Sequence, residues 1–238
     1  MSVGEGRTRP ARISVIVPVL NEERRIDARL EELSRTDGFQ EVLVVDGGSS
    51  DRTVEIARGY PGVRVFSAPR GRAVQMNAGA RVAAGDVLLF LHADVLLPQD
   101  AAQWVSTALS HPGTVAGAFR TWTVADAERS WLGPLLHLAD LRSRYSRLPY
   151  GDQALFVQRD AFWKVGGFPE QPLMEDLALS RRLRSMGRIR IVAANVRVSG
   201  RRFLTRPLWY GFLINVFPLL YRLGVSPRRL AALYGDPR

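Results

Sequence analysis

Residues 13–22 have the sequence ISVIVPVLNE, and residues 41–51 have the sequence EVLVVDGGSSD. Each stretch contains a run of β-branched and other apolar residues, which predicts one strand at 13–19 and another at 41–45, each buried on both faces of a sheet. The first run ends in Asn21-Glu22 and the second in Asp46-Gly47-Gly48. Two buried strands with polar ends indicate a parallel sheet that carries ligand-binding loops at one edge.

Further strands and helices alternate with these two stretches. Apolar runs predict strands at 63–66 and 87–91, and helical spacing predicts helices over 22–33, 51–57, 73–84 and 98–109. This alternation is typical of βαβ units with right-handed crossovers. A third polar cluster, His92-Ala93-Asp94, ends the strand at 87–91. We therefore expect the three polar clusters to converge at the carboxyl edge of the sheet.

The second half of the chain is less regular. It suggests strands at 115–123, 153–158 and 189–193, helices at 160–165 and 175–186, and an aromatic-rich stretch over 205–223. No internal repeat or low-complexity linker divides it. We expect a basic, flexible N-terminus over 1–12, one domain over 13–203 and a C-terminal helical segment over 204–238.

Composition narrows the class of protein. The chain has 238 residues, a formal net charge of +10 and no cysteine, which excludes disulfides, zinc-thiolate sites and a cysteine nucleophile. No secretory h-region or bilayer-spanning run is found, so a cytoplasmic protein is expected. The arginines are scattered and form no nucleic-acid module. A phosphorylated substrate, an anionic membrane or an arginine-rich proteome would each account for the charge.

Two carboxylates stand at strand ends. Asp46 could accept hydrogen bonds from a nucleobase or ribose above the glycine turn, or could bond its own turn backbone. Asp94 lies on the same side of its strand as His92, where a carboxylate suits a divalent cation that also contacts phosphate oxygens. Alternatively, Asp94 caps the helix that follows. Position alone leaves both pairs of interpretations open.

Two helix starts also carry candidate side chains. Glu175 and Asp176 open a helix, where acidic residues either interact with the helix dipole or supply a general base for an acceptor hydroxyl. Arg70 and Arg72 precede the helix at 73–84, and cations at a helix N-terminus can hold a diphosphate. The alternative for the arginines is a solvated basic loop.

The order of these segments resembles family 2 of the nucleotide-sugar glycosyltransferases. The resemblance covers residues 13–203 and is carried by Pro18 to Glu22, Val45 to Asp51, Gly71 to Gly79, Leu91 to Asp94, Gly151 to Gln153, Gly166 to Phe168 and Glu175 to Leu177. It is strongest with a compact bacterial subgroup whose genes lie near radical-SAM and selenium-related genes. The resemblance implies a GT-A fold, which is an α/β, Rossmann-like, mixed but mostly parallel sheet flanked by helices.

The resemblance also implies roles for particular residues. Asp176 would be the catalytic base, preceded by Glu175, and Asp94 would bind Mg²⁺ or Mn²⁺ at the diphosphate. Gly151, Asp152 and Gln153 would lie on the acceptor side. The nucleotide would be bound by His92 and Asp94 together with Pro18, Asn21, Glu22, Asp46, Gly48, Arg70, Arg72 and Asn77.

The chain departs from the family pattern at His92, where aspartate is common. Asp94 is then the sole carboxylate of the motif, and His92 is left to join the metal or to bond ribose. No histidine follows Asp176 to act as a later metal ligand. Arg201 and Arg202 are expected to neutralise the leaving diphosphate instead.

The resemblance implies an inverting transfer from a nucleotide-sugar, with UDP as the default and GDP or dTDP as options. The alternatives are a sugar-phosphate nucleotidyltransferase, which usually has a glycine-rich basic loop where Pro18 to Glu22 stand, and a non-catalytic nucleotide- or lipid-binding module. For the aromatic segment from Leu208 to Leu223 we expect packing on the domain or across a homodimer. The other interpretation is peripheral membrane contact that brings the enzyme to a lipid-linked acceptor.

Overall fold

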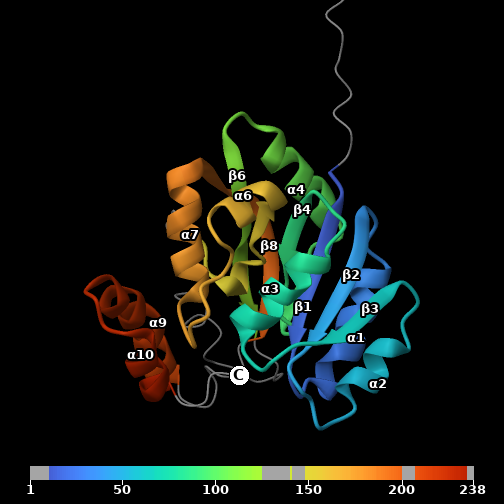
Figure 1. Ribbon diagram of the computed structural model, residues 1–238, viewed down its shortest axis with the longest axis horizontal. Helices are drawn as coiled ribbons and strands as arrows, with labels where there is room; N and C mark the ends of the chain where they lie inside the picture. The colour runs from blue at the N-terminus through green and yellow to red at the C-terminus, as the bar shows by residue number, and fades with distance from the viewer. Residues whose placement is uncertain (1–10, 125–139, 141–147, 200–206, 235–238) are drawn as a thin grey trace, which may run out of the picture.

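The computed structural model of the chain describes residues 11–124, 140, 148–199 and 207–234 (Figure 1). An eight-stranded sheet with the order β3-β2-β1-β4-β7-β6-β8-β5 forms its centre. The strands are β1 Ile13–Val19, β2 Phe39–Asp46, β3 Val63–Ser67, β4 Val87–Phe90, β5 Val95–Leu96, β6 Thr114–Val124, β7 Phe156–Gln158 and β8 Arg188–Ser199.

The sheet is mixed and mostly parallel, as predicted. β1 pairs in parallel with β2 and β4, β2 with β3, and β6 with β8. β7 runs antiparallel to β4 and β6, and β5 runs antiparallel to β8. The carboxyl ends of β1 to β4 therefore share one edge, at the bottom of Figure 1.

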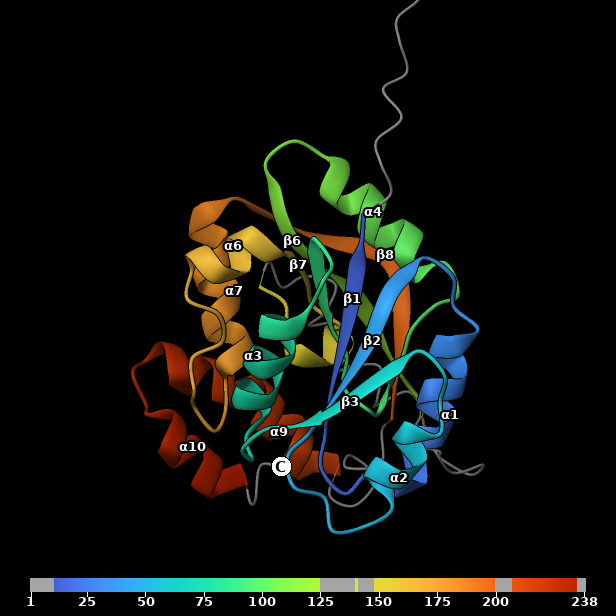
Figure 2. The same ribbon diagram turned by 45° about the vertical axis from the view of Figure 1, so that its right-hand side comes forward.

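Helices cover both faces of the sheet. The helices are α1 Glu23–Ser34, α2 Thr53–Arg58, α3 Arg72–Val82, α4 Ala101–Ser110, α6 Arg159–Lys164, α7 Glu175–Met186, α9 Pro207–Arg222 and α10 Pro227–Tyr234, with a 3₁₀ turn, η1, at Gly151–Gln153. α1, α2 and α4 pack on one face, and α3, α6 and α7 pack on the other (Figure 2). Neighbouring residues of β1 alternate between these layers: Val15 and Val17 contact the first and Ile16 the second.

Several boundaries differ from the sequence-based expectations. The helix expected from Pro98 begins at Ala101, because Pro98 instead accepts a turn hydrogen bond from the Ala101 N–H. The strand expected from residue 153 begins at Phe156, because residues 151–153 form η1. β8 continues to Ser199, beyond the expected end at 193. α9 is continuous through Pro218. The flexible N-terminus was expected over residues 1–12, of which residues 1–10 lie outside the described residues.

α9 and α10, joined by residues 223–226, form a C-terminal hairpin. In both ribbon views the hairpin lies beside the end of α7 at which that helix begins (Figures 1 and 2). None of the helices in the described part of the chain is long and apolar enough to cross a membrane.

Candidate active site

The β1 and β2 ends are tied together by the turn at Asn21. This residue has a left-handed backbone (φ 53°), its side-chain Oδ1 accepts from the Ser50 N–H at 2.8 Å, and its own N–H donates to Ser49 Oγ at 2.9 Å. Pro18 lies half-buried in β1 opposite Val45, and the Glu22 N–H donates to a threonine hydroxyl at the start of α2. The predicted nucleotide segment is therefore a cross-linked turn at the carboxyl edge.

Asp46 is almost fully buried at the end of β2, with 4% of its surface exposed. Its carboxylate accepts hydrogen bonds from the Gly48 N–H at 3.0 Å, the Ser49 N–H at 3.1 Å and the Ser49 hydroxyl at 2.5 Å. Gly48 has φ 95°, a conformation that favours glycine. The structure thus contains the turn-aspartate arrangement, while contact of Asp46 with a base stays a prediction.

Gln75 of α3 is a structural residue that the sequence analysis did not assign. Its buried Nε2 donates to the carbonyls of both Val19 and Val45 at 2.8 Å, which holds the ends of β1 and β2 together. A Cβ on Gly47 would lie 3.0 Å from the Gln75 side chain, so the glycine permits this close approach. The position of Gln75 four residues before the buried Gly79, on the same face of α3, was the available signal.

Asn77 of α3 has a structural role that was not predicted. Its side chain is buried and bonds the main chain of Phe168 twice, with Nδ2 donating to the carbonyl at 2.8 Å and Oδ1 accepting from the N–H at 3.0 Å. Gly167 has φ 67°, and a Cβ there would lie 2.9 Å from Asn77 Oδ1. Asn77 therefore anchors the Gly-Gly-Phe segment, while its contact with a diphosphate stays a prediction.

Three segments far apart in the sequence meet at Gly151. The Gly151 N–H donates to Asp176 Oδ2 at 2.5 Å. A Cβ built on Gly151 would lie 2.8 Å from His92 Cε1, 3.0 Å from His92 Nε2 and 3.3 Å from Asp176 Oδ2. Ser180, one turn further along α7, donates its hydroxyl hydrogen to the Pro149 carbonyl at 2.9 Å. The His92 imidazole and the Asp176 carboxylate thus both lie next to Gly151. Two hydrogen bonds fix α7 to the segment that contains Pro149 and Gly151.

Glu175 and Asp176 point to different environments, since consecutive helical residues face different directions. Glu175 is buried, and its Oε1 lies 3.4 Å from Arg72 Nη1. Burial raises the pKa of the Glu175 carboxyl; the Arg72 charge opposes this and the Asp176 charge adds to it. Asp176 is half-buried. Glu175 is therefore an internal partner of Arg72, and Asp176 is the more exposed of the two carboxylates.

A buried arginine lies beneath the His92–Asp94 segment. Arg29 of α1 is 5% exposed, forms an ion pair with Glu32, and donates from Nη2 to the Ala93 carbonyl at 3.4 Å. Burial lowers the pKa of Arg29, while the charges of Glu32 and Asp94 raise it. Arg29 was not predicted as a site residue, although its spacing places it on the same face of α1 as Leu33.

The donor set for a metal ion at this edge is small. Within the described residues no group of three or more His, Cys, Asp or Glu side chains could hold a metal. Asp94 and His92 are half-buried, two residues apart. Mg²⁺ commonly uses one or two carboxylates and completes its shell with phosphates and waters. The residues therefore fit an ion that arrives with a diphosphate, and do not fit a preformed all-protein cage.

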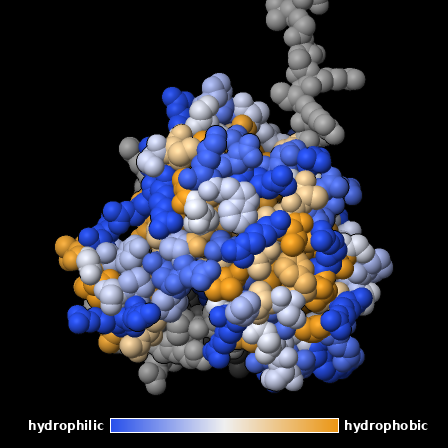
Figure 3. Space-filling view, viewed as in Figure 1, coloured by the Kyte–Doolittle hydropathy of each residue, from blue (hydrophilic) through white to orange (hydrophobic). Residues whose placement is uncertain are grey.

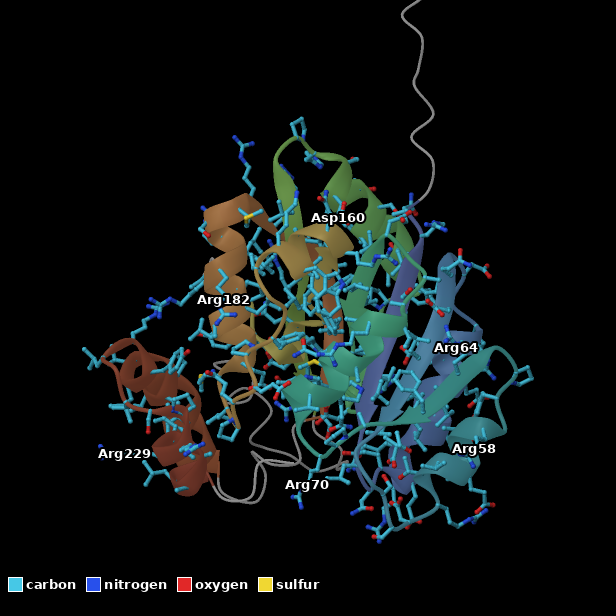
Figure 4. The ribbon with its side chains drawn as sticks, in the orientation of Figure 1. Arg58, Arg64, Arg70, Asp160, Arg182 and Arg229 are labelled. Atoms are coloured by element: carbon cyan, nitrogen blue, oxygen red, sulfur yellow. The ribbon has the colours of Figure 1, made fainter. Side chains whose placement is uncertain are left out.

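The remaining predicted residues are distributed as follows. Arg70 is exposed at the lower rim, at the same end of the molecule as Arg229 (Figure 4). Gln153 is buried, and its amide bonds the Phe119 carbonyl and the Tyr150 N–H, which stabilises η1; its place on the acceptor side stays a prediction. Asp152 is half-buried. Arg201 and Arg202 lie outside the described residues.

A separate hollow of about 570 Å³ lies at the opposite edge of the sheet, near Asp160 at the top of Figure 4. Its lining includes Asp86, Gln158 and Arg159 and none of the residues predicted for the site. The candidate active site is therefore the carboxyl edge, where the polar clusters meet.

Comparison with known proteins agrees with this geometry. The sequence profile of Glycosyl transferase family 2 matches residues 14–166. A 4,4'-diaponeurosporenoate glycosyltransferase of Staphylococcus haemolyticus is 37% identical over 106 residues, which cover 41% of this chain and 28% of that protein. A beta-monoglucosyldiacylglycerol synthase of Synechocystis is 28% identical over 200 residues, covering 76% of this chain and 42% of that protein. The matched stretches thus cover less than half of these relatives.

Solved structures resemble the chain in fold. The mannosyltransferase PcManGT from Pyrobaculum calidifontis, in complex with GDP-Man and Mn²⁺, has a TM-score of 0.63 and 26% identity, over 81% of this chain and 57% of that one. S. aureus TarS 1-349 in complex with UDP-GlcNAc has a TM-score of 0.61 and 21% identity, over 79% and 58% of the two chains, which shows the fold alone. Because the profile covers well over half of the sequence and the sheet has the GT-A arrangement, the chain belongs to glycosyl transferase family 2.

Proposed function

We propose that the chain is an inverting glycosyltransferase that moves a sugar from a nucleoside-diphosphate sugar, with UDP as the default nucleotide, to an acceptor hydroxyl group. The observation that carries the proposal is the meeting of His92, Gly151 and Asp176 at one point of the carboxyl edge. Membership of the compact bacterial subgroup is part of the same proposal.

Asp176 is the proposed general base. The Gly151 and Leu177 N–H groups each donate to one of its carboxylate oxygens, at 2.5 and 2.6 Å, and each oxygen keeps a lone pair. The carboxylate takes the proton of the acceptor hydroxyl while the acceptor oxygen bonds to the anomeric carbon. The bond from that carbon to the diphosphate oxygen breaks, and the nucleoside diphosphate leaves with the electron pair. One displacement inverts the configuration without a covalent enzyme intermediate.

The donor is proposed to lie across the β1 and β2 ends. Its base would stack near Asn21 and Asp46, and its diphosphate would face Arg70 and Arg72, whose charges favour a dianion. Asp94, with His92, would hold Mg²⁺ or Mn²⁺ at the diphosphate. Such an ion supplies charge neutralisation on the leaving group. One structural neighbour is in complex with GDP-Man and Mn²⁺.

The test of the base is Asp176→Asn, measured as release of nucleoside diphosphate from a nucleotide-sugar. Loss of a general base costs about 10²–10⁴-fold in rate, so we expect turnover to fall by that factor while donor binding remains. Asp160→Asn is a matched control, because Asp160 is exposed at the opposite edge (Figure 4). Retained turnover in Asp176→Asn would refute the assignment of the base.

The donor class can be tested by thermal stabilisation with UDP, GDP and dTDP, each with and without Mn²⁺ or Mg²⁺. A ligand that binds only the folded protein raises its melting temperature. We expect a metal-dependent shift with one nucleotide, and Asp94→Ala should abolish the metal-dependent part. Nucleotide binding without release of nucleoside diphosphate would favour the non-catalytic module, and formation of a nucleotide-sugar from a sugar phosphate would favour the nucleotidyltransferase.

The acceptor is proposed to be lipid-linked and reached at an anionic membrane surface. The C-terminal hairpin exposes the large apolar residues Leu223 and Leu233, and residues 207–234 contain three arginines and no acidic residue. Figure 3 shows hydrophobic and hydrophilic side chains interspersed over α9 and α10. One relative is named as a synthase of a glucosyldiacylglycerol, a lipid. Sedimentation with anionic but not zwitterionic vesicles, lost in Leu223→Ser, would support this; no sedimentation would refute it.

A further inference from the structure

The C-terminal hairpin packs against the segment that leads into the proposed base. Leu213 and Phe217 of α9 and Leu230 of α10 form a buried cluster, with 2%, 3% and 0% of their surfaces exposed. Leu173 and Met174, which precede Glu175, pack against this cluster from outside the hairpin. The ribbon views show the same juxtaposition, with the hairpin beside the start of α7 (Figures 1 and 2).

Met174 has a backbone conformation that its own side chain does not favour. Its φ of 64° and ψ of 20° lie in the left-handed region, and it occupies the N-cap of α7 without a side-chain capping bond. Residues other than glycine disfavour this conformation, because their Cβ comes too close to the following carbonyl oxygen. The surroundings must therefore hold it, and its side chain is half-buried against the hairpin cluster.

Left-handed residues recur at the candidate site. Within the described part of the chain, the non-glycine residues with positive φ are Asn21, Ala154 and Met174. The first lies in the predicted nucleotide segment, and the second directly follows η1, which contains Gly151. Strained backbone that gathers at one site is typical of functional positions, where the surroundings pay for the strain.

Met174 leads directly into the turn of α7 that carries Asp176. Asp176 follows it by two residues in the first turn of α7, and its Oδ2 accepts the Gly151 N–H at 2.5 Å. Relaxation of Met174 to a negative φ would turn the chain entering α7 and draw the carboxylate away from Gly151 and His92. Small displacements of this kind are costly in an active site, because about 1 Å of misplacement can lower a rate about 10²-fold.

We infer that Phe217, acting through Met174, is a positioning residue for Asp176, so that the C-terminal hairpin holds the base in its working orientation. The inference deepens the proposed function and rests on Asp176 being the base. Phe217 itself touches no substrate in this arrangement.

Hydrogen exchange and turnover of Phe217→Ala, without vesicles, test the inference. Amide exchange over residues 148–153 should become about tenfold faster, because the Gly151 N–H loses its partner. Release of nucleoside diphosphate from UDP-GlcNAc or GDP-Man, with water as acceptor, should fall about tenfold or more, while donor affinity stays unchanged. Leu219→Ala is the matched control, since Leu219 lies on the same helix and is 55% exposed.

A second pair of variants separates positioning from general loss of structure. Phe217→Leu should restore most of the turnover, because it refills the cluster. Adding Met174→Asn to Phe217→Ala should also raise turnover, since asparagine tolerates the left-handed conformation without support from packing. A merely structural role of Phe217 also allows the rescue by leucine, but it predicts no rescue by Met174→Asn.

The inference is overturned if Phe217→Ala keeps wild-type exchange at 148–153 and wild-type turnover, or if Leu219→Ala behaves in the same way as Phe217→Ala. Asp176→Asn measured in parallel separates the two proposals. If Asp176→Asn is active, the proposed base is wrong. If Asp176→Asn is inactive and Phe217→Ala is as fast as wild type, only the positioning inference fails.

Discussion

Gly151→Ala tests the geometry of the site with a single methyl group. The new Cβ would lie 2.8 Å from His92 Cε1 and 3.3 Å from Asp176 Oδ2. Carbon atoms in contact are about 3.5–4.0 Å apart, so the imidazole has to move by about 0.7 Å or more. Misplacement of about 1 Å can cost about 10²-fold in rate. We expect turnover to fall about 10- to 100-fold with donor affinity unchanged.

The cost of Gly151→Ala in stability should be small. Overpacking typically costs about 1–3 kcal/mol, and His92 is half-buried and can shift, so about 1 kcal/mol is expected. For a chain of this size that lowers the melting temperature by about 2–4 °C. Gly59→Ala, at the end of α2, is the control: its Cβ would meet the Ile56 carbonyl oxygen at 3.2 Å, away from the site.

A double variant decides whether the imidazole is the cause. If the added methyl acts by displacing His92, Gly151→Ala should cost less in a His92→Ala background than in the wild type, because the overlap is already removed. Nucleoside diphosphate release and thermal melting are measured for all four proteins. Wild-type turnover in Gly151→Ala, or an equal loss in both backgrounds, would refute the proposed convergence at Gly151.

Three further substitutions test buried groups. Glu175→Gln should raise the melting temperature at neutral pH, because burial raises the pKa of this carboxyl above its ordinary 4.5 and the protein loses stability as pH rises through the pKa of the folded state. In a series of melting curves against pH the gain should vanish below pH 4.5. A gain that is the same at every pH would contradict this. Arg29→Met should lower the free energy of unfolding in urea by about 3–5 kcal/mol, since it leaves the Glu32 carboxylate without its ion-pair partner. An unchanged free energy of unfolding would show that the ion pair is dispensable. Gly79→Ala should lower the stability measured by thermal melting by about 1–3 kcal/mol, because its Cβ would lie 2.5 Å from Ile16 Cγ2. An unchanged melting temperature would mean that the neighbouring core side chains can move to make room for the methyl group.

Local signals in the sequence were sufficient for the sheet and most helices. The strand at 13–19 was predicted with the bounds that β1 has, because a run of β-branched residues is a local property. The helix at 175–186 was predicted to the residue, since leucines at helical spacing precede a glycine. The carboxyl-edge placement of Asp46 and Asp94 followed from parallel topology alone.

Contacts between distant segments could not be predicted in the same way. Nothing near Gly151 in the sequence indicates that its N–H meets the Asp176 carboxylate 25 residues later. The left-handed backbone of Met174 could not be predicted either, because methionine does not favour this conformation. Asparagine, the residue at position 21, adopts it more readily. Both features arise from tertiary packing that overrides local preference, and both lie at the candidate site, where such conflicts are expected.

The helix α3 combines a predicted role in ligand binding with supporting contacts that were not predicted. Its N-terminus was expected to meet a diphosphate, and Arg72 there is within 3.4 Å of Glu175. Further along, however, the Gln75 amide bonds the ends of β1 and β2, and the Asn77 amide bonds Phe168. These polar side chains use their hydrogen bonds inside the protein, so α3 joins two strand ends to the Gly-Gly-Phe segment as one rigid support. A site that must hold charge in a fixed geometry depends on such supporting bonds as much as on the groups that touch the ligand.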